Sequence, residues 1–244
     1  MTQVPRTTTA TSQPASTTYT TRTSVTQVRT TPTTPAATSP TTAPSTTARE
    51  QIVVVRAAGY GITTAQLAAY QQTTSGWQRV FGPWTANIGR NGVAPPGAKR
   101  EGDGRTPSGR YGFSFFFGIA PDPGVKFAYR RVTSPTIVWD DDPASPNYNE
   151  WVDTRTGSAG ANPEPMYNAP VYNYGAVVAY NPARTPGLGS AIFLPVSLGR
   201  PTAGCIGLPT PELLALLRWL DPARSPTILI GTNSYVDSTG FRSS

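Results

Sequence analysis

The sequence predicts an all-β or β-dominated single domain with one short helix near its C-terminus. Three observations predict it: many short runs of β-branched and aromatic residues, abundant glycine and proline between them, and one segment with the apolar pattern of a helix. The 244 residues include 23 glycines and 26 prolines, which are typical of turns between short strands. Together these features favour a β-rich domain over alternating strands and helices.

The first strands are expected just after residue 50. Residues 52–56 (IVVVR) form a run of β-branched residues that is typical of a buried strand. Residues 64–71 then alternate apolar and polar side chains, a turn (TTSG) follows, and residues 77–88 suit a further strand. Alanine, glutamine and leucine in 64–71 also suit a helix, but the order strand, turn, strand favours a β-hairpin.

The remaining elements follow shorter signals. The aromatic run YGFSFFF predicts a strand over 111–117. Further strands are predicted at 136–139, 176–180, 191–194, 205–208 and 227–230. The helix is expected to have Thr210 as N-cap and Pro211 at its first position, to present leucines on one face, and to end at Pro222.

The composition divides the chain into three parts. Residues 1–49 consist almost entirely of Thr, Ser, Pro and Ala with a few Arg, so they cannot bury enough apolar surface to fold and are predicted to be a disordered spacer. A disordered tail without a function is the alternative. Residues 50–232 form the predicted domain, and 233–244 are expected to be a flexible C-terminal tail.

The charge balance indicates where the protein works. The formal net charge is +7 and the pI is about 9.8, which favours anionic surroundings such as wall polymers. Only 14% of residues are charged and the arginines are scattered, so nucleic acid is not expected as a partner. No apolar run reaches the ~20 residues of a transmembrane segment. The spacer composition predicts an extracytoplasmic location, secreted or cell-wall associated, although no signal segment is visible after Met1.

Cys205 is the only cysteine, and the chain contains no histidine. This excludes an internal disulfide and removes the commonest zinc ligands, so no metal and no cofactor are predicted. Cys205 lies between Gly204 and the apolar run 206–208, and a second apolar run, 191–194, ends at Pro195. A thiol at the facing ends of two strands is a candidate nucleophile, although such a thiol is usually activated by histidine. The alternative is a buried apolar residue.

A glycine-rich loop, KREGDGRTPSG (99–109), contains five charged residues. Its glycines allow left-handed turns, and its Asp and Thr side chains can bond the backbone of those turns. The loop is therefore either a brace for a neighbouring strand or, through Lys99 and Arg105, a site for a carboxylate or phosphate. The acidic run DDDP (140–143) could imitate a calcium loop, but its spacing fits no such motif. No context fixes two carboxylates at glycosidase spacing.

Four stretches resemble one protein family. KREGDGRTPSGRYGF, VWDDDPASPNYNEWV, EPMYN and GSAIFL…PTAGCIGLP occur in the order of the L,D-transpeptidase (YkuD-type) catalytic domain family, and the resemblance covers about residues 52–231. It implies a single β-sandwich-like domain in which a cysteine thiolate attacks a peptide carbonyl. Family members take the tetrapeptide stem of bacterial peptidoglycan, form a thioester, and pass the acyl group to an amine of a second stem. Peptidoglycan stem peptides are thus the implied partners, and a monomer is expected.

The resemblance also assigns residues. Cys205 matches the nucleophile in Thr202-Ala203-Gly204-Cys205, and the N–H groups of Gly204 and Cys205 would face the developing oxyanion, where such donors are worth ~3 kcal/mol. Residues 99–109 match a loop of the family that we interpret as bracing. The substrate-binding residues implied by the resemblance are Thr202, Arg200, Tyr148, Asn149, Glu164 and Tyr167.

The chain departs from the family at two positions. Pro195 stands where the family usually has histidine, and Gly207 replaces a common arginine, whose grip on the substrate carboxylate Arg200 could supply. Three hypotheses remain open: a cysteine acyltransferase with weak activity, a pseudoenzyme that binds peptidoglycan without catalysis, and a cationic surface adhesin that depends on its spacer. The proline could also be a sequencing error or a variant of one strain.

Overall fold

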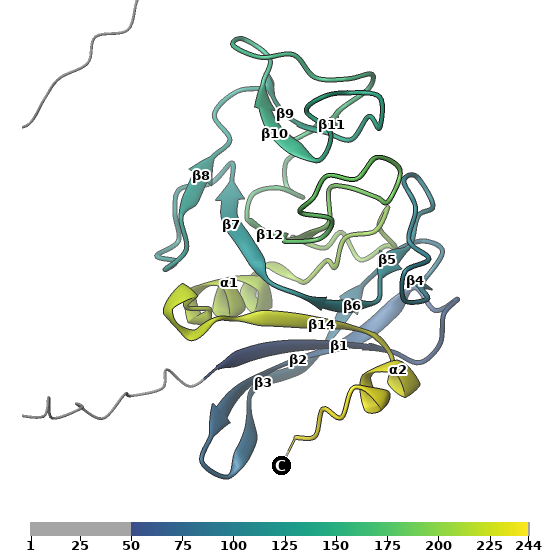
Figure 1. Cartoon of the computed structure of the whole chain (residues 1–244). Helices are drawn as coiled ribbons and strands as arrows, with labels where there is room; N and C mark the ends of the chain where they lie inside the picture. Colours follow the sequence, from purple (N-terminus) through teal and green to yellow (C-terminus); the bar gives the residue numbers. More distant parts are fainter. Residues whose placement is uncertain (1–49, 244) are drawn as a thin grey trace, which may run out of the picture. The chain divides into compact units, whose positions relative to one another are not determined.

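The computed structural model describes residues 50–243 (Figure 1). The predicted spacer, residues 1–49, lies outside the described residues. Strands predominate in the described part, with two α-helices and one 3-10 helix, so the β-dominated class is confirmed.

A five-stranded sheet forms the base of the domain, in the order β3-β2-β1-β14-β6. Its strands are β1 (Gln51–Ala57), β2 (Thr64–Thr73), β3 (Gly76–Asn87), β6 (Gly109–Tyr111) and β14 (Thr227–Thr232). The predicted hairpin is confirmed as β2 and β3, which pair antiparallel. The β-branched run of β1 occupies the centre, where it pairs antiparallel with β2 and parallel with β14.

A four-stranded sheet packs over one face of this base (Figure 1). Its order is β13-β12-β7-β8, and its strands are β7 (Phe113–Gly118), β8 (Tyr129–Arg131), β12 (Gly175–Val178) and β13 (Phe193–Pro195). The main hydrophobic core combines alternate residues of the base, inward residues of β7, β12 and β13, and the leucines of the first helix. This arrangement fixes β13, and with it the segment before Cys205.

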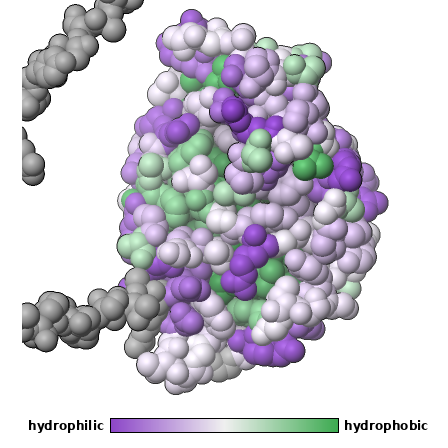
Figure 2. Space-filling model, in the orientation of Figure 1, coloured by the Kyte–Doolittle hydropathy of each residue, from purple (hydrophilic) through white to green (hydrophobic). Residues whose placement is uncertain are grey.

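The remaining strands form two smaller sheets. A three-stranded sheet, in the order β10-β9-β11, consists of β9 (Ile137–Asp140), β10 (Glu150–Asp153) and β11 (Glu164–Pro165). Its aromatic residues form a second core cluster with β7 and β13. The short strands β4 (Val93–Ala94) and β5 (Thr106–Pro107) pair parallel. Figure 2 shows an apolar area (green) at mid-height on one face of the molecule, bordered by hydrophilic residues.

The predicted helix is confirmed as α1 (Thr210–Trp219), but its start differs. Pro209 occupies the N-cap position and no side chain caps the helix, so Thr210 as N-cap is wrong. The helix ends before Pro222, which begins a 3-10 turn, η1 (Pro222–Arg224). Its leucines 213, 216 and 217 are buried in the main core.

The structure corrects the prediction of a flexible tail over residues 233–244. Residues Asn233–Ser238 form a second helix, α2, with the Thr232 side chain accepting a hydrogen bond from the Tyr235 N–H at its N-cap. Val236 and Phe241 are buried against the face of the base that is turned away from the main core. The segment therefore closes the lower side of the sheet (Figure 1), and the domain has two α-helices near its C-terminus.

The predicted strand over 205–208 is also wrong. Successive amides of this segment bond to different neighbours: the Ile206 N–H to Phe193 O at 2.9 Å, the Gly207 N–H to Asn87 O at 2.8 Å, and the Leu208 N–H to Pro195 O at 3.1 Å. A strand needs a ladder to one partner on each side. This segment instead joins β13 to the end of β3, and that places Cys205 between them.

Candidate active site

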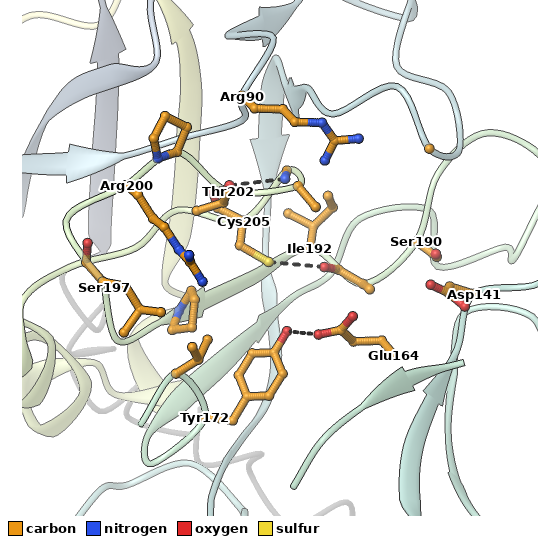
Figure 3. Close-up of a pocket in the computed structure, with 18 of the residues that line it drawn as sticks. Arg90, Asp141, Glu164, Tyr172, Ser190, Ile192, Ser197, Arg200, Thr202 and Cys205 are labelled. Carbon is orange, nitrogen blue, oxygen red and sulfur yellow. Dashed lines mark hydrogen bonds between the residues drawn. The ribbon is translucent and has the colours of Figure 1, made fainter. Parts of the chain in front are cut away.

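A cavity of about 340 Å³ opens beside Cys205 (Figure 3). Its walls come from the 99–102 part of the glycine-rich loop, from Asp141 and Glu164, from residues 171 and 172, and from the segment 190–205. The site thus gathers residues that are far apart in the sequence, Arg90 among them, around one thiol.

The loop that carries Cys205 is held by its own threonine, Thr202. Thr202 Oγ1 accepts a hydrogen bond from the Gly204 N–H at 3.1 Å and donates one to Cys205 O at 2.7 Å. Gly204 has φ +156°, and a Cβ at this position would lie 3.0 Å from Arg105 O and 3.3 Å from Ile192 Cδ1. Glycine is therefore required by both backbone conformation and space.

A second threonine connects the Cys205 loop to the glycine-rich loop. Thr106 is fully buried, and its Oγ1 donates to Gly204 O at 2.8 Å and accepts from the Gly89 N–H at 2.9 Å. One hydroxyl thus satisfies two buried backbone groups from distant segments. It holds the residue that precedes Cys205 in a fixed position.

The rest of the glycine-rich loop is braced from within. Lys99 is buried and pairs with Asp103 at 2.7 Å. Burial opposes ionisation of Asp103, but the hydrogen bonds from Lys99 and from the backbone outweigh it and lower its pKa. Glu101 Oε2 accepts hydrogen bonds from Tyr148 Oη at 2.5 Å and from Ser190 Oγ at 2.7 Å. These contacts support the bracing interpretation of residues 99–109, since the charge of Lys99 is used internally.

The Cys205 thiol is neutral in this environment. Its Sγ donates to Ala191 O at 3.3 Å, and this carbonyl is presented by a residue with φ +52°. Burial raises the pKa of the thiol to about 12 and the negative charge of Glu164 adds to the rise, while a backbone hydrogen bond from Phe193 and the charge of Lys99 lower it. A thiol must lose its proton to attack a carbonyl, so this site needs a proton acceptor.

No histidine supplies one. The chain contains none; Pro195, the last residue of β13, lines the cavity, and its carbonyl accepts the Leu208 N–H. Two N–H groups were expected to stabilise an oxyanion. One of them, the Gly204 N–H, already donates to Thr202 Oγ1. The Cys205 N–H makes no hydrogen bond to any of residues 50–243.

A family model for the L,D-transpeptidase catalytic domain, YkuD, matches residues 49–230. The chain belongs to this family. No curated protein and no solved structure matches the chain. Proteins of the family are in general acyltransferases that act on peptidoglycan, so the family match and the cavity at Cys205 point to the same region of the chain.

Five of the residues that the family resemblance assigned lie together. The cavity is lined by Cys205, Gly204, Thr202, Arg200 and Glu164. The other three assigned residues, which were expected to face substrate, lie elsewhere. Tyr148 is buried and donates to Glu101, and it also accepts the Gly189 N–H. It braces the loop instead of facing the cavity.

Asn149 and Tyr167 are not among the residues that line the cavity. Asn149 has φ +61°; its Oδ1 accepts hydrogen bonds from the Ala191 N–H and the Trp139 indole, and its amide donates to the carbonyls of Tyr180 and Asn181. It therefore fixes the turn that presents the Ala191 carbonyl. Tyr167 is 49% exposed.

The ionisable cavity residues that sequence reasoning did not assign to the site include Arg90, Asp141 and Tyr172. Tyr172 is 4% exposed, and its hydroxyl donates to Glu164 Oε1 at 2.6 Å. Burial, followed by the negative charge of Glu101, raises the pKa of Asp141 to about 6. Asp141 lay in a stretch that already carried the family resemblance, but nothing in the sequence separated it from its neighbours. Tyr172 carried no local signal.

The acidic run 140–143 does not converge on a cation. Asp140 accepts from Ser145 and from the Gly160 N–H, and Asp142 accepts from the N–H groups of Ala144 and Ala161. Within residues 50–243, no group of His, Cys, Asp and Glu side chains is arranged to hold a metal. These carboxylates stabilise turns beside the site.

Proposed function

We propose that this protein is a cysteine acyltransferase that acts on peptidoglycan stem peptides through a thioester at Cys205. The observation that carries the proposal is the placement of Cys205 at the wall of a cavity, on a loop held from both sides by Thr202 and Thr106. Such rigid presentation of a nucleophile at an open cavity is what acyl transfer requires.

The charges around the cavity fit a peptide with both carboxylate and ammonium groups. Arg90 and Arg200 line it and make no ion pair with another described residue, so they are available for carboxylates. Asp141 and Glu164 line another part of the same cavity (Figure 3), and they suit an ammonium group. A stem peptide that contains a diamino acid and a free carboxylate carries both.

A second candidate function has an observation of its own. The proline at the position of the family histidine and the raised thiol pKa favour a pseudoenzyme that binds peptidoglycan stems at the cell surface without transferring them. Both candidates use the same cavity. They differ in whether Cys205 becomes acylated.

The proposed location and oligomeric state are the same for both candidate functions. A basic protein of this family is expected to work outside the cytoplasm, secreted or associated with the wall, as a monomer that needs no cofactor. None of the helices in residues 50–243 has the length and apolarity that a membrane crossing requires. The adhesin hypothesis concerns residues 1–49, which lie outside the described residues.

The first experiment is intact mass spectrometry after incubation with a carbapenem, whose strained β-lactam carbonyl is a reactive acyl donor. The acyltransferase is expected to gain one adduct, and Cys205→Ala is expected to gain none. Pro195→His is expected to increase the acylation rate by on the order of 100-fold, the usual contribution of a general base.

Absence of an adduct in the native protein, with an adduct in Pro195→His, would rule out the acyltransferase and favour the binding module. In that case the native protein and Cys205→Ala should sediment equally well with isolated peptidoglycan. Lack of sedimentation would remove the binding module as well.

A further inference from the structure

We propose that Tyr172, supported by the carboxylate of Glu164, accepts the proton of the Cys205 thiol in place of a histidine. The inference deepens the proposed acyl transfer and rests on it. That reaction requires a proton acceptor, and the side chain of Pro195 cannot be one. Glu164 is the first residue of β11 and Tyr172 lies between β11 and β12, so both are far in sequence from Pro195 and Cys205.

Cys205, Tyr172 and Glu164 all line the cavity. Figure 3 shows the Tyr172 hydroxyl pointing toward Cys205 and meeting the Glu164 carboxylate. Cys205 packs against the core cluster that contains Tyr172. Burial raises the pKa of Tyr172 well above its ordinary value, and the nearby charges of Cys205 and Glu164 add to the rise. The thiol and the phenol are therefore close enough to influence each other's ionisation.

The hydrogen bonding leaves Tyr172 free to accept. A phenol has one proton and two lone pairs, and the proton of Tyr172 is directed at Glu164 Oε1 at 2.6 Å. The Tyr172 oxygen therefore presents lone pairs to the cavity. The Cys205 S–H at present donates to Ala191 O at 3.3 Å, which is a weak bond. Rotation about the Cβ–Sγ bond releases the hydrogen from Ala191 O.

The proposed proton transfer is balanced. The S–H bond breaks as its proton passes to Tyr172 Oη, and the Tyr172 proton passes to Glu164 Oε1, which leaves a thiolate and a neutral carboxylic acid. The thiolate forms a C–S bond with the peptide carbonyl. As the C–N bond breaks, the proton returns by the same path to the leaving amine, so the products are a thioester and an amine.

The test is the rate at which Cys205 reacts with iodoacetamide, a small neutral electrophile, followed by intact mass in the full-length protein. We expect Glu164→Gln and Tyr172→Phe to slow alkylation at pH 7.5 by about 100-fold, the usual size of general-base catalysis. Both changes keep the shape of the side chain. Circular dichroism and thermal unfolding confirm that each variant is folded.

The sign of the Glu164→Gln effect separates this proposal from electrostatics alone. The negative charge of Glu164 raises the pKa of the thiol, so its removal by itself would increase the thiolate fraction and accelerate alkylation. A faster or unchanged rate in Glu164→Gln overturns the proposal, and so does an unchanged rate in Tyr172→Phe. A slower rate in both supports it.

The control variants remove one tyrosine hydroxyl and one glutamate carboxylate outside the cavity. Tyr129 Oη donates to the Ala120 carbonyl, and Glu150 pairs with Arg184; neither residue lines the cavity. Tyr129→Phe and Glu150→Gln are expected to leave the alkylation rate within about twofold of the native rate. A loss in these controls as large as in the two test variants overturns the proposal.

The pH profile gives a readout that a structural role would not change. Without Tyr172 as proton acceptor, only the thiol that is already ionised reacts with iodoacetamide. Below the thiol pKa this fraction rises about tenfold per pH unit, so the alkylation rate of Tyr172→Phe should rise equally steeply between pH 7 and 9. The native rate should rise less steeply, and an equally steep native profile overturns the proposal. The other charged groups of the cavity, which stay in place in every variant, are Arg90, Lys99, Glu101, Asp141 and Arg200.

Alkylation does not depend on recognition of a β-lactam or a stem peptide. If the native protein forms no carbapenem adduct but its alkylation depends on Tyr172 and Glu164, the proton acceptor stands and the proposed acyl transfer fails. If the adduct forms at the same rate in native protein, Tyr172→Phe and Glu164→Gln, acyl transfer stands and the proton acceptor fails.

Discussion

At the scale of single residues, the ionisation of Asp141 sets part of the charge of the cavity. Its side chain lines the cavity and accepts no hydrogen bond from a side chain or from another residue's backbone within residues 50–243. Burial and the negative charges of Glu101, Glu164 and Asp140 raise its pKa to about 6. The cavity therefore gains a negative charge near neutral pH, which would strengthen its attraction for an ammonium group.

Asp141→Asn should stabilise the protein at neutral pH. Because the folded-state pKa is raised, ionising Asp141 costs the folded state free energy as pH rises from about 4 to about 6, and the full cost persists above that. Allowing for solvent screening of a half-buried group, the gain at pH 7.5 should be on the order of 1 kcal/mol and should vanish below pH 4. Urea unfolding of both proteins at several pH values measures it.

The neighbouring carboxylate provides an opposite control. Hydrogen bonds from the backbone of Ala161 and Ala144 lower the pKa of Asp142, so its ionised form stabilises the fold above the unfolded-state pKa. Asp142→Asn should therefore destabilise at neutral pH, with the difference lost as pH falls. A stabilisation by Asp141→Asn that does not vary with pH would contradict the raised pKa.

The sequence was informative where a residue is defined by its neighbours in the chain. The sequence placed Cys205, Thr202 and Gly204 at one site, and the structure shows them in one local turn. Tyr172 could not be assigned, because its hydroxyl acquires a role only when the chain brings Glu164 and Cys205 to the same cavity. Tyr148 was misassigned for the same reason: its partner Glu101 comes from a distant loop.

At the scale of elements, the segment 205–208 is held by backbone hydrogen bonds to two neighbouring segments and is not a strand itself. Its apolar residues resemble a strand in sequence, since periodicity cannot separate a buried strand from a buried irregular segment. Gly207 exchanges two backbone hydrogen bonds with Asn87, at 3.0 and 2.8 Å, while residues on either side bond to β13. The positions of several strands, the hairpin and α1 followed from patterns that span several residues.

Thr106→Val should weaken both the fold and the site. Valine has nearly the same shape but cannot donate to Gly204 O or accept from the Gly89 N–H, which leaves two buried backbone groups unsatisfied. The free energy of unfolding should fall by about 2–3 kcal/mol, and carbapenem acylation should slow because Gly204 loses its anchor. Urea unfolding and adduct formation measure the two effects.

Ser108→Ala is the matched comparison in the same loop. Ser108 is buried and donates to Ala94 O at 2.6 Å, away from Cys205. Its loss should cost about 1 kcal/mol and leave the acylation rate unchanged. Equal acylation in Thr106→Val and native protein would show that this threonine stabilises the fold without positioning the nucleophile.

At the scale of the whole molecule, the central sheet separates two cores. Alternate residues of β1 point to opposite faces: Val53 and Val55 join the main core beside the site, whereas Ile52 and Val54 join a smaller cluster under α2. The continuous β-branched run of β1 predicted a buried strand, and burial on both faces explains why the run does not alternate with polar residues. What covers the second face was missed, because the C-terminal segment is mostly polar and only Val236 and Phe241 enter the core.

Phe241→Ala tests whether this second core stabilises the domain without influencing the site. The Phe241 ring is 5% exposed and lies 5.1 Å from the Tyr70 ring and 6.0 Å from the Trp77 ring, centre to centre. Removing it should lower the free energy of unfolding by about 3 kcal/mol, seen as a lower urea midpoint with an unchanged m value. The alkylation rate of Cys205 should stay at the native level under conditions where the variant is folded, because the cavity lies on the other side of the base. An unchanged midpoint would show that the C-terminal segment adds nothing to stability, and a slower alkylation of the folded variant would show that the two cores are coupled through the sheet.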